Sequence, residues 1–320
     1  MIPAKNKPLY KVISLFIKSA ILFFSFYYIY DKLKEAPLIL DVPMLFSKEN
    51  RWYTVSLLLL MIANWSVEAI KWKRLIEPLE KINFNQSLKG VLAGVTISIF
   101  TPNRIGEFAG RVFFLKQSDK IQATILSLIG SIAQLIVTLV AGILAFYILE
   151  KKYYDFFQIE TFVSVNLLFL IFLLLIALSA MVIYFVLKKQ PQSEKFKKYF
   201  DTLKLHSKKS LNTVLNLSIL RYIIFSIQYY LALKIFGING GVVIVFSLIA
   251  LTFFVTSAIP TFALTEIAVR TGVAIYFFGT ISDAHASILA ASLFLWMINL
   301  AIPSIAGSFF VHKLNFFKEH

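Results

Sequence analysis

Three long stretches without any Asp, Glu, Lys or Arg constrain this chain more than any other feature. They cover residues 121–149, 161–187 and 284–312. A helix that crosses the hydrocarbon core of a bilayer needs about 20 apolar residues, and each stretch exceeds that length. In the whole chain 58% of residues are hydrophobic and 15% are charged, whereas roughly 25% are charged in an ordinary soluble domain. The sequence therefore predicts an all-α integral membrane protein.

Three further stretches are apolar apart from one embedded charge each. They are residues 12–30 with Lys18, residues 52–70 with Glu68, and residues 211–233 with Arg221. Each charge lies towards one end of its stretch, where a long side chain can reach the interface and keep its charged group hydrated. We therefore predict six transmembrane helices, and we expect Glu68 and Arg221 at the interface rather than in the membrane centre.

Residues 90–103 form an apolar segment that is too short to cross the membrane. Its 14 uncharged positions reach about 21 Å as a helix, which is less than the roughly 30 Å thickness of the hydrocarbon core. The chain then passes Pro102 and Asn103, and a second apolar arm continues to Lys116. Because proline lacks the N–H that continues a helix, we predict a re-entrant helical hairpin with its tip at these two residues.

A second region repeats this pattern later in the chain. Residues 242–259 are apolar, stop at Pro260 and Thr261, and are followed by another apolar arm at 265–279. We predict a second re-entrant hairpin here. The fold class is therefore six transmembrane helices plus two re-entrant hairpins, which a hydropathy plot would count as eight spans.

The loop charges indicate how the chain is oriented. Residues 71–89 carry five Lys and Arg against two acids, and residues 188–209 carry eight Lys against Glu194 and Asp201. Loops rich in Lys and Arg remain in the cytoplasm. Both loops lie on that side only if the segment 87–116 turns back within the membrane. We therefore expect a plasma-membrane protein with cytoplasmic N- and C-termini, and we assign the net charge of +15 to topology rather than to nucleic-acid binding.

The same order of elements occurs twice, with opposite orientation. Within a single membrane domain (1–320), we predict a first repeat at 1–150 and a second, inverted repeat at 161–313. Each repeat contains a Glu-x-Ala-x-Arg sequence shortly after the hairpin proline, at Glu107 to Arg111 and at Glu266 to Arg270. Inverted repeats with broken helices at the membrane midplane are typical of secondary transporters, where the breaks form the substrate site.

The ionisable residues of the two hairpins are the candidate binding residues. Glu107 and Arg111, like Glu266 and Arg270, are four residues apart and so share a helix face. Ionisable groups at membrane depth are costly unless they are paired or face a wet cavity. The pairs either bind substrate or only pin the hairpin arms, and Arg104 is the better candidate for a ligand contact. The free N–H groups of a helix that starts at depth also attract anions, and Asn103 or Thr261 could cap such a start.

Other functional classes find no support in the sequence. The chain has no cysteine, and its four histidines lack metal-ligand spacing. It contains no phosphate-binding loop and no nucleophile elbow, so we expect no metal, no cofactor and no catalytic residue. Gln134 and Asn299, inside apolar stretches, are expected to form hydrogen bonds between helices.

The segment Pro102-Asn103-Arg104-Ile105-Gly106-Glu107, followed by Arg111, resembles a known family motif. It is similar to the flippase-like transmembrane domain of lysylphosphatidylglycerol synthases, in which the motif is Pro-x-Arg-x-Gly-Glu followed by an Arg. The segment from Pro260 to Glu266 resembles a second, looser motif of the family, although the glycine pair often found before that Glu is absent here.

The resemblance implies a function in moving lipids. In full-length relatives the membrane domain is implicated in moving a modified phospholipid between leaflets, and a separate soluble domain makes that lipid. The longest loop here, 188–209, has no room for such a domain. We therefore expect a flippase for an anionic phospholipid or lipid-linked intermediate, with a separate lipid-synthesising enzyme as a partner. The alternatives are a membrane-embedded lipid-phosphate transferase and a non-transporting accessory subunit.

Overall fold

The computed structural model describes residues 42–101, 104–116, 118–152, 198–199, 201–202, 205–259 and 263–311. These residues form helices joined by short turns, with no strand among them, so the predicted all-α class is confirmed. The predicted spans at 12–30 and 161–187 lie outside the described residues. So do most of the basic loop at 188–209 and the C-terminal residues from 312 onwards.

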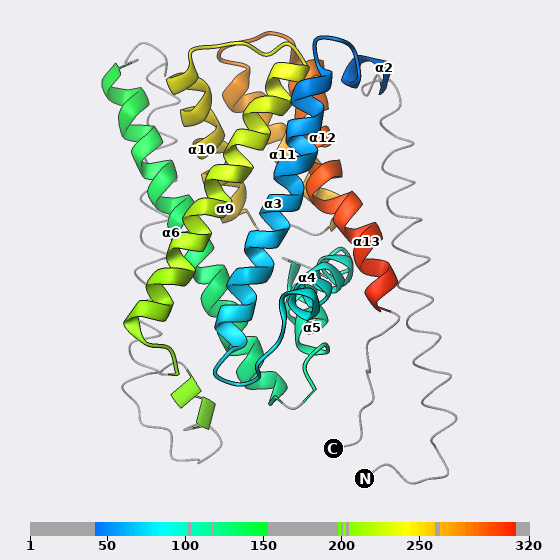
Figure 1. Ribbon diagram of the computed structural model, residues 1–320. Helices are drawn as coiled ribbons and strands as arrows, with labels where there is room; N and C mark the ends of the chain where they lie inside the picture. Colours follow the sequence, from blue (N-terminus) through cyan, green and yellow to red (C-terminus); the bar gives the residue numbers. More distant parts are fainter. Residues whose placement is uncertain are drawn as a thin grey trace.

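Within the described residues, four helical segments are long and apolar enough to cross a membrane. They are α3 (Arg51–Ile76), α6 (Lys120–Lys152), α9 (Lys208–Ile235) and the segment His285–Val311. In Figure 1, α3, α6 and α9 run along most of the height of the molecule. The four segments coincide with the spans predicted at 52–70, 121–149, 211–233 and 284–312. The protein is therefore a multi-pass membrane protein.

Both predicted hairpin regions fold as a helix, a break and a second helix. The first consists of α4 (Phe84–Ser98) and α5 (Gly106–Val112), and the second of α10 (Val242–Ala258) and α11 (Ala263–Phe278). Even the longest, α10, has 17 residues, fewer than the roughly 20 needed for a crossing. The predicted tip residues Pro102, Asn103, Pro260 and Thr261 lie outside the described residues.

The two hairpins occupy opposite halves of the helix bundle. In Figure 1, α4 and α5 lie in the lower half, whereas α10 and α11 lie in the upper half. Across the bundle, α4 packs against α13 (Ile302–Val311), and α10 packs against α6. This placement is compatible with an inverted repeat. The division into repeats at 1–150 and 161–313 stays a prediction, because the first span of each half, at 12–30 and at 161–187, lies outside the described residues.

Three glycines allow the first hairpin to close tightly. A Cβ atom on Gly110 of α5 would lie 2.4 Å from the Cα of Gly94 on α4. A Cβ on Gly94 would in turn lie 2.6 Å from the carbonyl oxygen of Glu107, and one on Gly106 would lie 2.7 Å from that of Ile97. Since real Cβ atoms do not approach other atoms so closely, only glycine permits this contact between the two arms.

The last membrane-spanning segment is interrupted in its middle. It consists of α12 (His285–Trp296), the π-helix η4 (Met297–Ala301) and α13. Pro303 follows shortly after the π-helix; it cannot donate a helical hydrogen bond, and its ring crowds the carbonyl of residue 299. Widening of the helix at this point accommodates the proline. The irregularity places Asn299 in the interior of the bundle, where it is buried.

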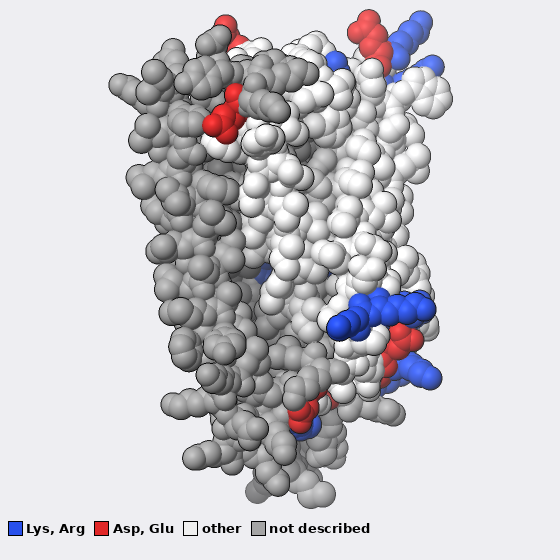
Figure 2. Space-filling model, turned by 90° about the vertical axis from the view of Figure 1, so that its left-hand side faces the viewer, with Lys and Arg blue, Asp and Glu red and all other residues white. Residues whose placement is uncertain are grey.

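The outer surface of the described helices matches a lipid environment. Large apolar side chains on α6 are exposed, among them Ile136 and Leu144. Figure 2 shows charged side chains near both ends of the molecule and a band between them that is nearly free of charge where residues are described. The small α2 (Val42–Leu45) lies at one end, beside the start of α3.

Candidate functional site

Glu68 is the centre of a buried ionic cluster between α3, α5 and α9. Its carboxylate lies 2.7 Å from Lys71 Nζ, 2.8 Å from Arg111 Nη2 and 3.1 Å from Arg221 Nη1. The side chain is only 4% exposed. Both side chains are thus paired inside the bundle, and the expectation that Glu68 and Arg221 lie at the depth of the membrane interface stays a prediction. The two charges remain inside because α3, α5 and α9 bring them together, so that each has a partner within the bundle.

Both predicted Glu–Arg pairs are formed. Arg111 donates to Glu107 on α5 as well as to Glu68, so its guanidinium is shared between two carboxylates. On α11, Arg270 Nη2 lies 3.0 Å from Glu266 Oε1, and Glu266 is buried. The Glu107–Arg111 pair is thus connected to α3 and α9 through Glu68. For the Glu266–Arg270 pair, the ion pair described is the one within α11.

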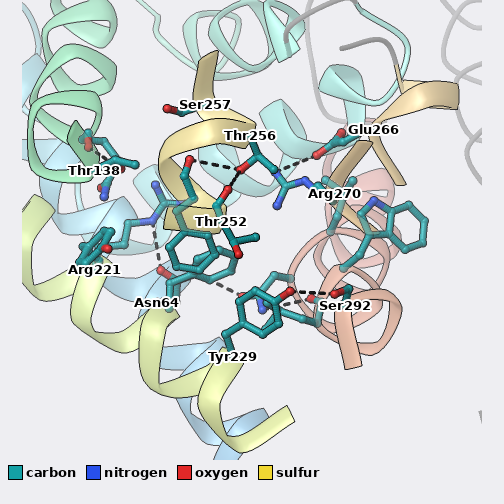
Figure 3. Close-up of a pocket in the computed structure, with 18 of the residues that line it drawn as sticks. Asn64, Thr138, Arg221, Tyr229, Thr252, Thr256, Ser257, Glu266, Arg270 and Ser292 are labelled. Carbon is teal, nitrogen blue, oxygen red and sulfur yellow. Dashed lines mark hydrogen bonds and ion pairs between the residues drawn. The ribbon is translucent and has the colours of Figure 1, made fainter. Parts of the chain in front are cut away.

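A cavity of about 240 Å³ lies between the second hairpin, α3, α9 and the last membrane-spanning segment. Its described lining contains three arginines, Arg104, Arg221 and Arg270, and one carboxylate, Glu266. Hydroxyl and amide groups make up much of the remaining wall, and Trp65 and Phe253 contribute aromatic surface. Figure 3 shows Arg221 and Arg270 converging on the cavity from α9 and α11. Glu107 and Arg111 are not part of the lining and support it from behind.

Arg104 has an unusual conformation at the wall of this cavity. Its φ angle is 59°, a left-handed value that non-glycine residues seldom adopt. Two buried nitrogens of its guanidinium group, Nε and Nη2, have no hydrogen-bond partner among the described residues. The charge of Arg104 interacts electrostatically with both Glu107 and Glu266. Arg104 therefore interacts with the carboxylates of both hairpins and keeps two donors without a partner among the described residues, as a ligand contact requires.

Arg221 is held at the cavity by three neighbours. Nε donates to Asn64 Oδ1 over 3.1 Å, Nη1 contacts Glu68, and the guanidinium lies 5.4 Å from the centre of the Trp65 ring. The indole nitrogen of Trp65 is buried and has no acceptor in the described part of the chain. Sequence reasoning missed Asn64 and Trp65. The one available signal was a polar side chain and an indole beside each other in the middle of an apolar stretch.

Neutral polar groups connect the helices around the cavity. Asn64 donates to Asn299 over 3.2 Å, Gln134 donates to the Ser218 carbonyl over 3.3 Å, and Tyr229 shares a hydrogen bond of 2.7 Å with Ser292. The predicted interhelical hydrogen bonds of Gln134 and Asn299 are thus confirmed. Both residues also line the cavity, which the sequence did not indicate.

The start of α5 is less suited to anion binding than expected. The Gly106 N–H donates to Thr101 Oγ over 2.7 Å, so the hydroxyl of the preceding turn already uses it. With seven residues, α5 is also too short to carry a large helix dipole. The proposed caps Asn103 and Thr261 lie outside the described residues. Among the residues that are described, no group of His, Asp and Glu has the arrangement of a metal site.

Comparisons with known proteins agree with this architecture. Neither the curated proteins nor the solved structures contain a match to the chain. The family model described as "Lysylphosphatidylglycerol synthase TM region" matches residues 15–307, which include every helix named above except the end of α13. The chain therefore belongs to the lysylphosphatidylglycerol synthase TM region family.

Proposed function

We propose that this protein is a lipid flippase, which moves an anionic phospholipid or a lipid-linked intermediate between the leaflets of the plasma membrane. The observation that carries the proposal is the polar cavity inside an otherwise apolar helix bundle, with three arginines against one carboxylate in its described lining. Ionisable groups are kept at membrane depth only where they are paired or used. Arg104, with two unpartnered nitrogens, is not fully paired by the described residues.

The proposed mechanism assigns the head group to the cavity and the acyl chains to the surrounding lipid. Arg104 and Arg221 bind the anionic group, because guanidinium groups form paired hydrogen bonds with phosphate oxygens. Glu266 and Arg270 also line the cavity. Arg111 pairs with Glu107 and with Glu68 of α3, and so holds the first hairpin in place. Two hairpins in opposite halves of the bundle give the two leaflets separate access routes to one site, as in other transporters with broken helices.

The same proposal includes two further points. The N- and C-termini are cytoplasmic, and the protein cooperates with a separate lipid-synthesising enzyme. A flippase needs a supply of its lipid on one side of the membrane. The residues around the end of α3 support a cytoplasmic position for it, because Lys73, Arg74, Lys81 and Lys89 remain basic there besides the buried Lys71.

Reconstitution tests the proposal directly. Proteoliposomes containing a fluorescent anionic lipid are treated with a membrane-impermeant quencher, and the fraction of lipid that becomes accessible is followed over time. The native protein should give nearly complete quenching, and Arg104→Ala should slow transfer at least tenfold. Arg74→Ala is the matched control, since Arg74 forms only an exposed pair with Glu77 and should leave transfer unchanged.

The alternatives predict different results in the same experiment. If half of the lipid stays protected with correctly folded native protein, the chain is not a flippase for that lipid. Thin-layer or mass analysis of the recovered lipid then distinguishes a transferase, which would change its head group, from an accessory subunit, which would not.

A further inference from the structure

We infer that the cavity selects a lipid phosphomonoester, bound as a dianion, over phosphodiester lipids and over lipids whose head group carries an amine. This inference rests on the proposed function, because it specifies the substrate class of the same site. It starts from the balance of charge among the buried residues rather than from any single contact.

The charges in and around the cavity do not cancel. In the described residues, five cations face three carboxylates. The cations are Lys71, Arg104, Arg111, Arg221 and Arg270, and the carboxylates are Glu68, Glu107 and Glu266. The single carboxylate of Glu68 forms ion pairs with Lys71, Arg111 and Arg221. Among the described residues an excess of two positive charges therefore remains. The same excess is found in the described lining alone, where Arg104, Arg221 and Arg270 accompany only Glu266.

This excess determines which head groups the site favours. Arginine stays protonated in proteins, so the site cannot lose its charge by releasing protons from Arg104, Arg221 or Arg270. A ligand with two negative charges neutralises the excess, whereas a phosphodiester with one negative charge neutralises half of it. A head group with a net positive charge adds to the repulsion, and like charges in a low-dielectric interior are strongly unfavourable.

The unpartnered donors fit a phosphate group. Nε and Nη2 of Arg104 form one edge of the guanidinium, the edge that binds two oxygens of a phosphate at once. The buried indole N–H of Trp65 is a third donor without an acceptor among the described residues, and it lies beside Arg221. A phosphomonoester offers three terminal oxygens, compared with two in a phosphodiester. The cavity volume of about 240 Å³ corresponds to roughly eight water molecules, enough for a phosphate group with its first ester atoms.

Binding measurements with defined lipids test the inference. Purified protein in detergent is titrated with short-chain phosphatidic acid, phosphatidylglycerol and lysyl-phosphatidylglycerol, with tryptophan fluorescence as the readout and Trp65→Phe as the control for the cavity signal. Phosphatidic acid should bind at least tenfold more tightly than phosphatidylglycerol, and the cationic lipid should not compete. Arg104→Ala should reduce the preference, and Arg74→Ala should preserve it.

The pH dependence provides a second readout. The second pKa of a phosphomonoester is about 6. The dianion therefore predominates at pH 8, and affinity for phosphatidic acid should fall about tenfold at pH 5. The phosphodiester of phosphatidylglycerol does not titrate in this range. Any change of its affinity with pH therefore reports a change in the protein itself. The titratable and charged protein groups in the described lining are Arg104, Arg221, Tyr222, Tyr229, Glu266 and Arg270. Outside the lining, Glu68 contacts Arg221, Lys71 and Arg111, and Arg111 contacts Glu107.

The outcomes separate this inference from the proposed function. Equal or tighter binding of phosphatidylglycerol, or competition by the lysyl lipid, would overturn the inference even if lipid transfer were observed. Selective binding of phosphatidic acid without transfer would support the substrate class and contradict the flippase function. Glycerol phosphate is the water-soluble phosphomonoester used for comparison. If it competed for the site as strongly as phosphatidic acid does, the assignment of the ligand to a lipid would be overturned.

Discussion

The guanidinium group of Arg111 lies 2.8 Å from the carboxylate of Glu68, in the interior of the helix bundle. Arg111 belongs to the first hairpin and Glu68 to α3. Arg221 of α9 reaches the same carboxylate. Glu68 thus connects the first hairpin to α3 and α9 and positions Arg221 at the cavity.

Substitution of Glu68 by Gln should strongly destabilise the protein. Lys71, Arg111 and Arg221 would lose the carboxylate that they share, and loss of one partner of a buried ion pair costs about 3–5 kcal/mol. Thermal unfolding in detergent measures the effect. Glu77→Gln is the control, because Glu77 forms only an exposed pair with Arg74, and such pairs contribute less than about 1 kcal/mol. Equal unfolding temperatures for the two variants would contradict the role of Glu68.

Substitution of Gly110 by Ala should force the first hairpin apart. The added Cβ would lie 2.4 Å from the Cα of Gly94, and overpacking of this kind costs about 1–3 kcal/mol. Gly272 of α11 offers the matched control, since a Cβ there meets no atom within 4 Å. Gly272→Ala should be neutral or stabilising by about 0.5–1 kcal/mol through its helix propensity. Denaturation of both variants measures the difference, and a stable Gly110→Ala protein would show that the hairpin is not closely packed.

Substitution of Arg104 by Gly should stabilise the protein and impair lipid transfer. Glycine adopts a φ angle of 59° without strain, whereas other residues lose about 1–2 kcal/mol in this conformation. Arg104→Ala also removes the charge but keeps the backbone strain. We therefore expect the Gly variant to be about 1 kcal/mol more stable than the Ala variant, with equally low transfer. A higher unfolding midpoint for Arg104→Ala would argue against backbone strain at this position.

Asp119, before the start of α6, should contribute to stability in a pH-dependent way. A hydrogen bond from Lys198 at 2.7 Å lowers the pKa of Asp119; partial burial opposes this, and the backbone N–H groups of Ile121 and Gln122 add to it. Because the folded-state pKa is depressed, the contribution is present at neutral pH and is lost as the pH falls below about 4.

Two variants separate the cap of α6 from the ion pair. Asp119→Ala should lose about 1 kcal/mol at pH 7, as expected for removal of a helix cap. Asp119→Asn keeps an acceptor for the backbone N–H groups and should lose less. Unfolding is measured between pH 7 and pH 3, and the gap between the native protein and Asp119→Ala should narrow towards the acid end. A gap that is constant over this range would rule out titration of Asp119 as its cause.

Local features of the sequence predicted most of the described architecture. The spans at 52–70, 121–149, 211–233 and 284–312 depend only on the length of an apolar stretch, and the two hairpins depend on arms too short to cross a bilayer. The pairs Glu107–Arg111 and Glu266–Arg270 depend on the spacing of one helical turn. Each of these features is set within a few dozen residues, so pattern and length suffice.

Features that depend on several helices could not be predicted in this way. Glu68 and Arg221 were assigned to the interface because each lies towards one end of its apolar stretch. In the bundle, however, Arg111 of α5 contacts Glu68, and Asn64 of α3 contacts Arg221. The sequence also did not predict that Trp65 and Gln134 line the cavity, because an apolar stretch does not show which face of its helix points inwards.

The sequence by itself determined that this chain is a helical membrane protein with two broken helices. The length of an apolar stretch and the charge of a loop are properties of contiguous residues, so both can be read without the tertiary structure. Only the tertiary structure decided where the charges lie, because a buried charge is tolerated only when side chains from other helices surround it. Arg104, Arg221 and Arg270 come from three separate regions of the sequence, and packing of the bundle brings them to one cavity with one carboxylate in its described lining.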